Sequence, residues 1–140
     1  MLLQTVRPNN VQSIRAYRVE DLAQAAQAVG QHFLYVNLTA AQSKQDVLDA
    51  IAAAFLFPPH FGKNLDALYD CVTDLEPGRG PAGPGLVLLV EHLPEGPGFD
   101  AGQRDALLEV FRDAADWFAE RGVAFRVFHS VSRGGPPAPR

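Results

Sequence analysis

Apolar and polar positions alternate along the chain with a period that switches between two and about 3.6 residues, which predicts strands alternating with helices. Residues 13–19 alternate polar and apolar side chains, the pattern of a strand with one wet face at the edge of a sheet. Residues 20–29 carry apolar side chains at helical spacing, and Gly30 suits the position after a helix. Together these segments predict a strand–helix unit over residues 13–30.

Further apolar segments predict three strands, at residues 33–38, 86–91 and 123–128. The first two are almost continuously apolar, which is typical of parallel strands covered on both faces. Between these strands, apolar residues at helical spacing predict three helices, at residues 44–57, 64–76 and 100–121. Strands that alternate with helices favour parallel pairing through right-handed crossovers. The predicted fold class is therefore α/β, a three-stranded parallel sheet packed with helices plus the added N-terminal unit.

Proline and glycine mark the remaining segments. Residues 77–85 and 94–99 are rich in both, so loops without regular structure are expected there. Residues 132–140 have the composition of a disordered tail. We expect one domain over residues 1–131, with its core at about residues 33–128.

The segment from Phe57 to Glu76 holds the clearest candidate chemistry, because its helix carries acids along one face. Asn64 is placed to cap that helix by accepting a hydrogen bond from an amide one turn in. Asp66, Asp70 and Asp74 follow at intervals of four, and each such pair of like charges costs roughly 0.2–0.5 kcal/mol in an isolated helix. The stripe is either an ordinary solvated face or a surface for a cation-lined partner, and spacing alone leaves both open.

The charge composition of the chain indicates which kinds of partner it can bind. Sixteen acids against twelve basic residues give a formal net charge of −4, which disfavours binding to nucleic acid phosphates and favours a basic partner. Cys71 is the single cysteine, so no intramolecular disulfide can form, as expected in a reducing compartment. No apolar run approaches the length of a membrane span. The expected location is the cytoplasm.

An enzyme would need side chains that the sequence does not group together. His60 and His92 could form a metal or acid–base cluster with Asp66 and Asp70, but no histidine or cysteine pair has metal-ligand spacing. The sequence also lacks a G-x-S-x-G turn and a phosphate-binding loop. We expect no catalytic activity, no metal and no cofactor.

One run of residues resembles a known family. F-P-x-x-F-G-x-N-L-D-A-L-Y-D-C, over residues 57–71, is similar to the signature of the barstar family, small intracellular inhibitors of barnase-type ribonucleases. Residues 110–114, Val-Phe-Arg-Asp-Ala, resemble the last helix of that family. The resemblance covers about residues 33–128 and implies the same three-stranded parallel core.

The resemblance also implies a partner-binding site. Asp66 and Asp70 match two acids that take the place of substrate phosphates in the ribonuclease active site. Tyr69 matches an aromatic position, His60 stands where the family presents a tyrosine, and Asp113 matches an acid at the edge of the interface. Three neighbours are expected to shape the loop and cap the helix, with a special backbone angle at the glycine: Phe61, Gly62 and Asn64.

We therefore expect a monomeric inhibitor, of the kind that serves as a bacterial antitoxin or immunity protein. It would plug the active site of a basic ribonuclease, or of a ribonuclease-like toxin, in a one-to-one complex. The alternative is a protein–protein binding module on the same fold whose partner is not a ribonuclease. The sequence leaves open the identity of the target and the role of the N-terminal unit.

Overall fold

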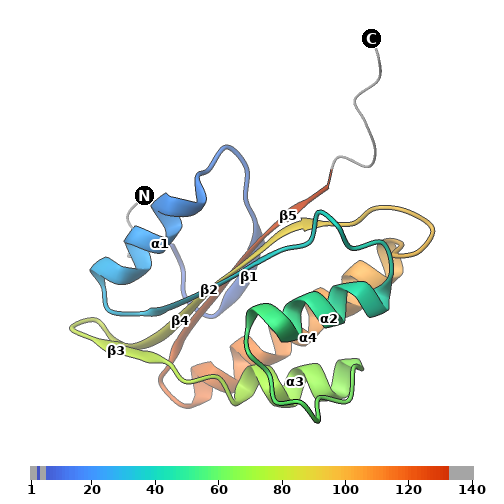
Figure 1. Cartoon of the computed structure of the whole chain (residues 1–140). Helices are drawn as coiled ribbons and strands as arrows, with labels where there is room; N and C mark the ends of the chain where they lie inside the picture. Colours follow the sequence, from blue (N-terminus) through green and yellow to red (C-terminus); the bar gives the residue numbers. More distant parts are fainter. Residues whose placement is uncertain (1–2, 4–5, 133–140) are drawn as a thin grey trace.

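A mixed sheet runs through the middle of the protein, with helices packed on both of its faces (Figure 1). The computed structural model describes residue 3 and residues 6–132 of the 140-residue chain. The strands are β1 (Asn10–Ser13), β2 (His32–Asn37), β3 (Gly78–Gly80), β4 (Gly83–Leu93) and β5 (Ala124–Val131). The helices are α1 (Val19–Ala28), α2 (Lys44–Ala54), α3 (Leu65–Thr73) and α4 (Ala101–Glu120). Within the described residues, every helix is too short or too polar to cross a bilayer.

The strands lie in the order β1-β5-β4-β2, and all three pairings along this path are parallel. Strand β3 lies off the path and pairs antiparallel with the start of β4. The sheet thus has five strands in the part of the chain that the structure describes. The expectation of a three-stranded sheet with one added strand is therefore corrected.

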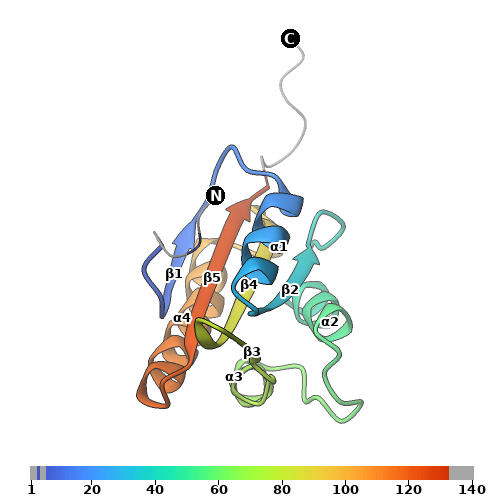
Figure 2. The same ribbon diagram turned by 90° about the vertical axis from the view of Figure 1, so that its left-hand side faces the viewer.

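Two hydrophobic layers cover the two faces of the sheet. On one face, side chains of α2, α3 and α4 pack against alternate residues of β4 and β5, such as Leu88 and Phe125. On the other face, α1 packs through Leu22 and Ala26 against the intervening residues, such as Leu89. Figure 2 shows α1 in front of the sheet and α4 passing behind it. The near-continuous apolar sequence of β4 follows from this double coverage.

The helices begin and end through the local signals in the sequence. Ser43 Oγ accepts a hydrogen bond from the amide of Asp46 at 3.1 Å and caps α2. Asp100 and Gln103 form a reciprocal capping box at the start of α4. Gly122 follows α4 with φ of 72°, the left-handed conformation that a residue after a helix commonly adopts. The predicted helix starts are confirmed, whereas α2 and α3 each end three residues before the predicted 57 and 76.

The N-terminal strand lies earlier than predicted. The prediction was residues 13–19, but β1 is Asn10–Ser13 and pairs with Arg126–His129 of β5. Ala16 has φ of 51°, and Val19 already belongs to α1, so the alternation after Ser13 falls in a turn and a helix start. A short alternation of polar and apolar residues is not enough to locate a strand. The residues that form β1 are decided by their pairing with β5.

The segment predicted as an irregular loop, residues 77–85, forms a β-hairpin. Gly80 pairs with Gly83 across a two-residue turn, and β4 starts there and not at Leu86. The glycines permit this, since a Cβ on Gly80 would overlap Val29 O and Gly30 Cα. Close packing against the end of α1 outweighs the weak strand propensity of glycine. The tail after Ser132 lies outside the described residues.

Candidate partner-binding site

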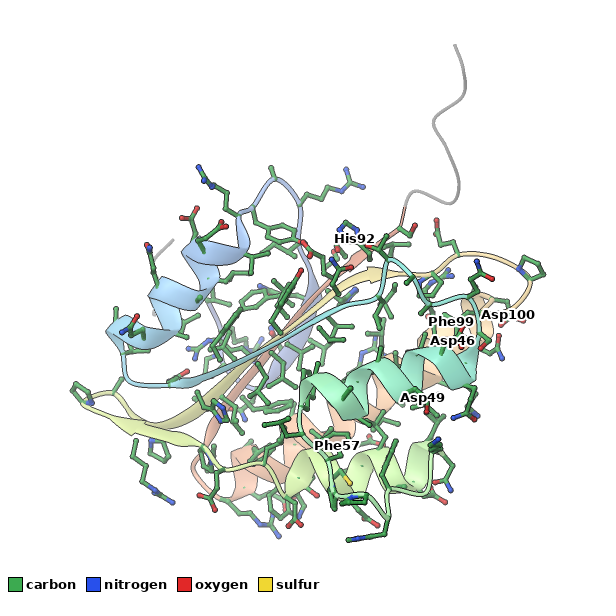
Figure 3. The ribbon with its side chains drawn as sticks, in the orientation of Figure 1. Asp46, Asp49, Phe57, His92, Phe99 and Asp100 are labelled. Atoms are coloured by element: carbon green, nitrogen blue, oxygen red, sulfur yellow. The ribbon has the colours of Figure 1, made fainter. Side chains whose placement is uncertain are left out.

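The loop that enters α3 is held by two aromatic rings and a helix cap. Phe61 is buried, its amide bonds to the carbonyl of Pro58, and its ring lies 5.3 Å from that of Phe57 between centroids. Figure 3 shows Phe57 on the segment that leaves α2. Asn64 Oδ1 accepts a hydrogen bond from the amide of Ala67 at 2.8 Å, as the sequence predicts. The start of α3 is therefore fixed by both packing and a hydrogen bond.

Gly62 does not have the backbone angle expected of it. The left-handed residue of this loop is Lys63, with φ of 55°, and Gly62 does not have positive φ. A Cβ on Gly62 would lie 3.4 Å from Asn64 Nδ2 and 3.5 Å from Ala67 Cβ, at about ordinary van der Waals contact. The turn of this loop is made one residue later, at Lys63.

Helices α3 and α4 pack together, and a shallow hollow lies where their exposed faces meet. We call it the acidic groove; its volume is about 500 Å³. It is lined by Leu65, Asp66, Tyr69 and Asp70 of α3 and by Val110 and Asp113 of α4. The groove brings together four of the five predicted partner-binding residues. Leu65 and Val110 were missed as lining residues, although both lie in the segments that resemble the family, residues 57–71 and 110–114.

Within the part of the chain that the structure describes, the carboxylates of the groove are unpaired. Asp66, Asp70 and Asp113 form no ion pair or side-chain hydrogen bond with any described residue. Lys63, close in sequence, directs its Nζ to Asp49 Oδ1 of α2 at 3.3 Å. Arg112, next to Asp113, pairs with Glu109 at 3.1 Å. Neighbouring cations are thus occupied elsewhere, and the groove carries three uncompensated negative charges.

The predicted acidic stripe is shorter than expected. Helix α3 ends at Thr73, so Asp74 is its C-cap residue and lies outside the groove. His60 also does not line the groove; it is exposed in the loop before α3. The sequence placed these residues on one surface by spacing or resemblance, whereas the end of the helix and the path of the loop separate them.

Cys71 lies on α3 beside Asp70 and is half buried against the hydrophobic layer. Burial raises the pKa of its thiol, and the charges of Asp74 and Asp70 add to the effect. Because the thiolate is the reactive form, this environment makes Cys71 a structural residue and a poor nucleophile.

The cluster that an enzyme would need is separated in space. His92 lies at the end of β4, far from α3, as Figure 3 shows. Among residue 3 and residues 6–132, no group of three or more His, Cys, Asp or Glu side chains could hold a metal ion. What the groove offers chemically is a set of fixed hydrogen-bond acceptors with negative charge.

The sequence was compared with known proteins. The model of the family described as Barstar (barnase inhibitor) matches residues 31–130. No curated protein matches the chain. The matched range is more than two thirds of the chain and includes every residue of the acidic groove, whereas β1 and α1 precede it. The chain therefore belongs to the barstar family.

Proposed function

We propose that this protein inhibits a basic ribonuclease, or a ribonuclease-like toxin, by covering its active site with the acidic groove. Members of the barstar family are inhibitors and not enzymes, and the family bears the name of a ribonuclease inhibitor. The observation that carries the proposal is the convergence of Asp66, Asp70 and Asp113, from two helices, without ion pairs among the described residues. Such a surface is complementary to a cation-lined cleft.

The mechanism follows from what a ribonuclease active site must contain. It holds phosphates with Arg, Lys and His side chains, and carboxylates satisfy the same donors. Asp66 and Asp70 are one turn apart on α3, about 6 Å along the axis. Because they are fixed on a capped helix, they can occupy two phosphate positions at once and present no phosphodiester bond to cleave. The ribonuclease is then blocked without any reaction.

The remaining residues would set the orientation of the complex. Tyr69 also lines the groove and is half buried, and large aromatic side chains are frequent hot spots of interfaces. Asp113 contributes a third charge, from α4, and this second point of contact would keep the bound partner from rotating about the axis of α3. His60 would contact the partner outside the groove. The proposed complex is one-to-one, forms in the cytoplasm and uses no cofactor.

The decisive variant is Asp70→Ala, measured by calorimetric titration against a catalytically inactive barnase-type ribonuclease. Removal of one charge leaves the opposing cations unpaired and should cost roughly 2–5 kcal/mol, a range borrowed from charge pairs that include the barnase complex itself. That corresponds to about 30-fold to several thousand-fold in affinity. Asp105→Ala, an exposed acid of α4 outside the groove, removes the same charge and should change affinity by less than about threefold.

The free protein supplies the second arm of this experiment. Asp70 is exposed, unpaired among the described residues, and has Asp66 and Asp74 four residues away on either side. Asp70→Ala should therefore leave the free energy of unfolding unchanged or raise it by a few tenths of a kcal/mol. Unchanged binding together with a destabilised free protein would show that the acids are structural and that the proposed surface is wrong.

One observation favours the alternative of a different partner on the same surface. His60 replaces a tyrosine in the family pattern, and the imidazole ring is smaller and more polar than a phenol. A pull-down at low salt with the wild-type protein and Asp70→Ala as matched baits separates the two functions. Capture of a ribonuclease by the wild-type bait alone supports inhibition, whereas selective capture of another basic protein supports a general binding module.

A further inference from the structure

A second cleft lies at the opposite end of the protein from the acidic groove. In Figure 2 the parallel strands all point away from α3, and the cleft lies where β1, β4 and β5 end. Its volume is about 480 Å³. One wall is formed by residues 13–17, which precede the range matched by the family, and the other by residues 129–132. In parallel sheets, the crevice outside the carboxyl ends of the strands is the common place for a ligand.

His92 is held at this cleft by an irregularity in β4. The pairing of β4 with β5 shifts register between Val90 and Leu93, and His92 has φ of 63°. The left-handed conformation costs a non-glycine residue on the order of 1–2 kcal/mol. The amide of His92 donates to Ser130 Oγ at 3.0 Å, which anchors the bulge. Bulges of this kind commonly direct a side chain toward a functional site.

A buried carboxylate supports the wall formed by residues 13–17. Glu91 is only 9% exposed, and it accepts hydrogen bonds from the hydroxyl groups of Tyr17, at 2.6 Å, and of Tyr35. The Tyr17 hydroxyl also lies 3.2 Å from Ser130 Oγ. These bonds tie the segment before α1 to β2, β4 and β5. Glu91 itself does not line the cleft, but its Oε1 lies 3.8 Å from Nε2 of His92, which does.

The side chains that do line the cleft favour an anion. Arg15 lies in its wall and forms no ion pair or hydrogen bond with any described residue. His92 and His129 add two imidazole rings, and the Nδ1 atom of His129 is buried without a hydrogen-bond partner within the described chain. The one acid of the lining, Glu95, lies 3.8 Å from the guanidinium of Arg104. Arg15 and His129 are therefore the basic side chains of the lining that have no partner among the described residues, whereas the ring of His92 already lies near Glu91 through Nε2.

We propose that this cleft binds a small oxyanion, such as the phosphate or carboxylate group of a metabolite. Arg15 supplies the charge, and His92 and His129 supply hydrogen-bond donors. Because residues 13–17 build one wall, the site gives the N-terminal segment a role that the family core lacks. It is independent of ribonuclease binding, since it shares no residue with the acidic groove.

The four histidines of the chain make the test internally controlled. Inorganic phosphate is titrated into the full-length protein at constant ionic strength, and the imidazole proton resonances are followed by NMR. The signals of His92 and His129 should shift saturably, with a dissociation constant of about 1 mM or lower. Those of His32 and His60, which lie outside the cleft, should not. A parallel titration with acetate shows whether a carboxylate is accepted as well as a phosphate.

Matched variants complete the test. Arg15→Gln should raise the dissociation constant at least fivefold, a coupling of about 1 kcal/mol. Arg7→Gln removes the same charge from an exposed residue outside the cleft and should have no effect. Asp70→Ala, which probes the acidic groove, should also leave phosphate binding unchanged. Equal, unsaturable shifts of all four histidines, or binding that is insensitive to Arg15→Gln, would overturn the proposal.

Discussion

Among single residues, Cys71 shows most directly how neighbours set reactivity. Its thiol is half buried on α3, and burial together with Asp74 and Asp70 raises its pKa. The thiolate fraction at neutral pH is therefore lower than in the unfolded chain. We expect iodoacetamide to alkylate Cys71 at least about tenfold more slowly in the native protein than in urea, measured by mass spectrometry. Asp74→Asn, which removes one of the charges, should speed the native reaction; equal rates in both states would mean that this face is open.

Predictions for single residues were correct where the contact that decides their role joins residues close together in the sequence. Asn64 caps α3, and Ser43 caps α2, through amides three residues away. The prediction for Gly62 failed because the sequence shows only that a turn is needed, whereas the φ of 55° falls on Lys63. The packing of Phe61 against Phe57 decides the path of that loop.

At the level of secondary structure, the Asn64 cap links the stability of α3 to the geometry of the acidic groove. Asn64→Ala removes the acceptor of the Ala67 amide and should lower the free energy of unfolding by about 1 kcal/mol. Asn64→Asp keeps a hydrogen-bond acceptor at this position and should retain most of the free energy of unfolding that Asn64→Ala loses. Urea unfolding compares the two variants. Affinity for the ribonuclease should also fall in Asn64→Ala, because Asp66 lies in the turn that frays; unchanged stability would contradict the cap.

The β3–β4 hairpin offers a second test of an element. Gly80 lies against Val29 and Gly30, where a side chain has no room, so Gly80→Ala should destabilise the protein by roughly 1–3 kcal/mol. A Cβ on Gly96 would meet no residue other than its chain neighbours within 4 Å, so Gly96→Ala is the matched control with little expected effect. Thermal unfolding measures both. Equal tolerance at the two positions would show that the hairpin does not pack on the end of α1.

For the whole molecule, the buried carboxylate of Glu91 couples stability to pH. Burial, followed by the hydrogen bond to Glu91, raises the pKa of both Tyr17 and Tyr35 from 10.0 to about 12. Their contribution to stability is therefore complete below pH 10 and is lost as pH rises from about 10 to about 12. We expect the free energy of unfolding to fall over this range.

The variant Tyr35→Phe tests how much the hydrogen bond between Tyr35 and Glu91 contributes to stability and to its pH dependence. The variant should lose roughly 1.5–3 kcal/mol at pH 8, the range for a hydrogen bond to a charged group. Its free energy of unfolding should also depend less on pH above 10 than that of the wild type. Urea titrations at a series of pH values measure both quantities. Parallel pH profiles for the two proteins would show that Tyr35 does not report on Glu91.

The order of the four helices and of every described strand except β3, the helix caps, the buried strands and the spacing of Asp66 and Asp70 were all readable from the amino acids. Each depends on contacts within about one helical turn or on the periodicity of burial, which neighbouring residues determine. The family signature over residues 57–71 likewise lies in one continuous segment. Sequence reasoning was therefore reliable for the helices, for the buried strands and for the positions of Asp66 and Asp70 on one helix.

Tertiary packing decided the rest, because the contacts involved join segments that are distant along the chain. The hairpin exists where Gly80 meets Gly30, β1 is defined by its pairing with β5, and Asp113 reaches the groove only because α4 packs on α3. Pairing between Lys63 and Asp49 leaves the groove uncompensated. Such contacts depend on which surfaces meet when the layers close around the sheet, and periodicity within a segment carries no information about its partner.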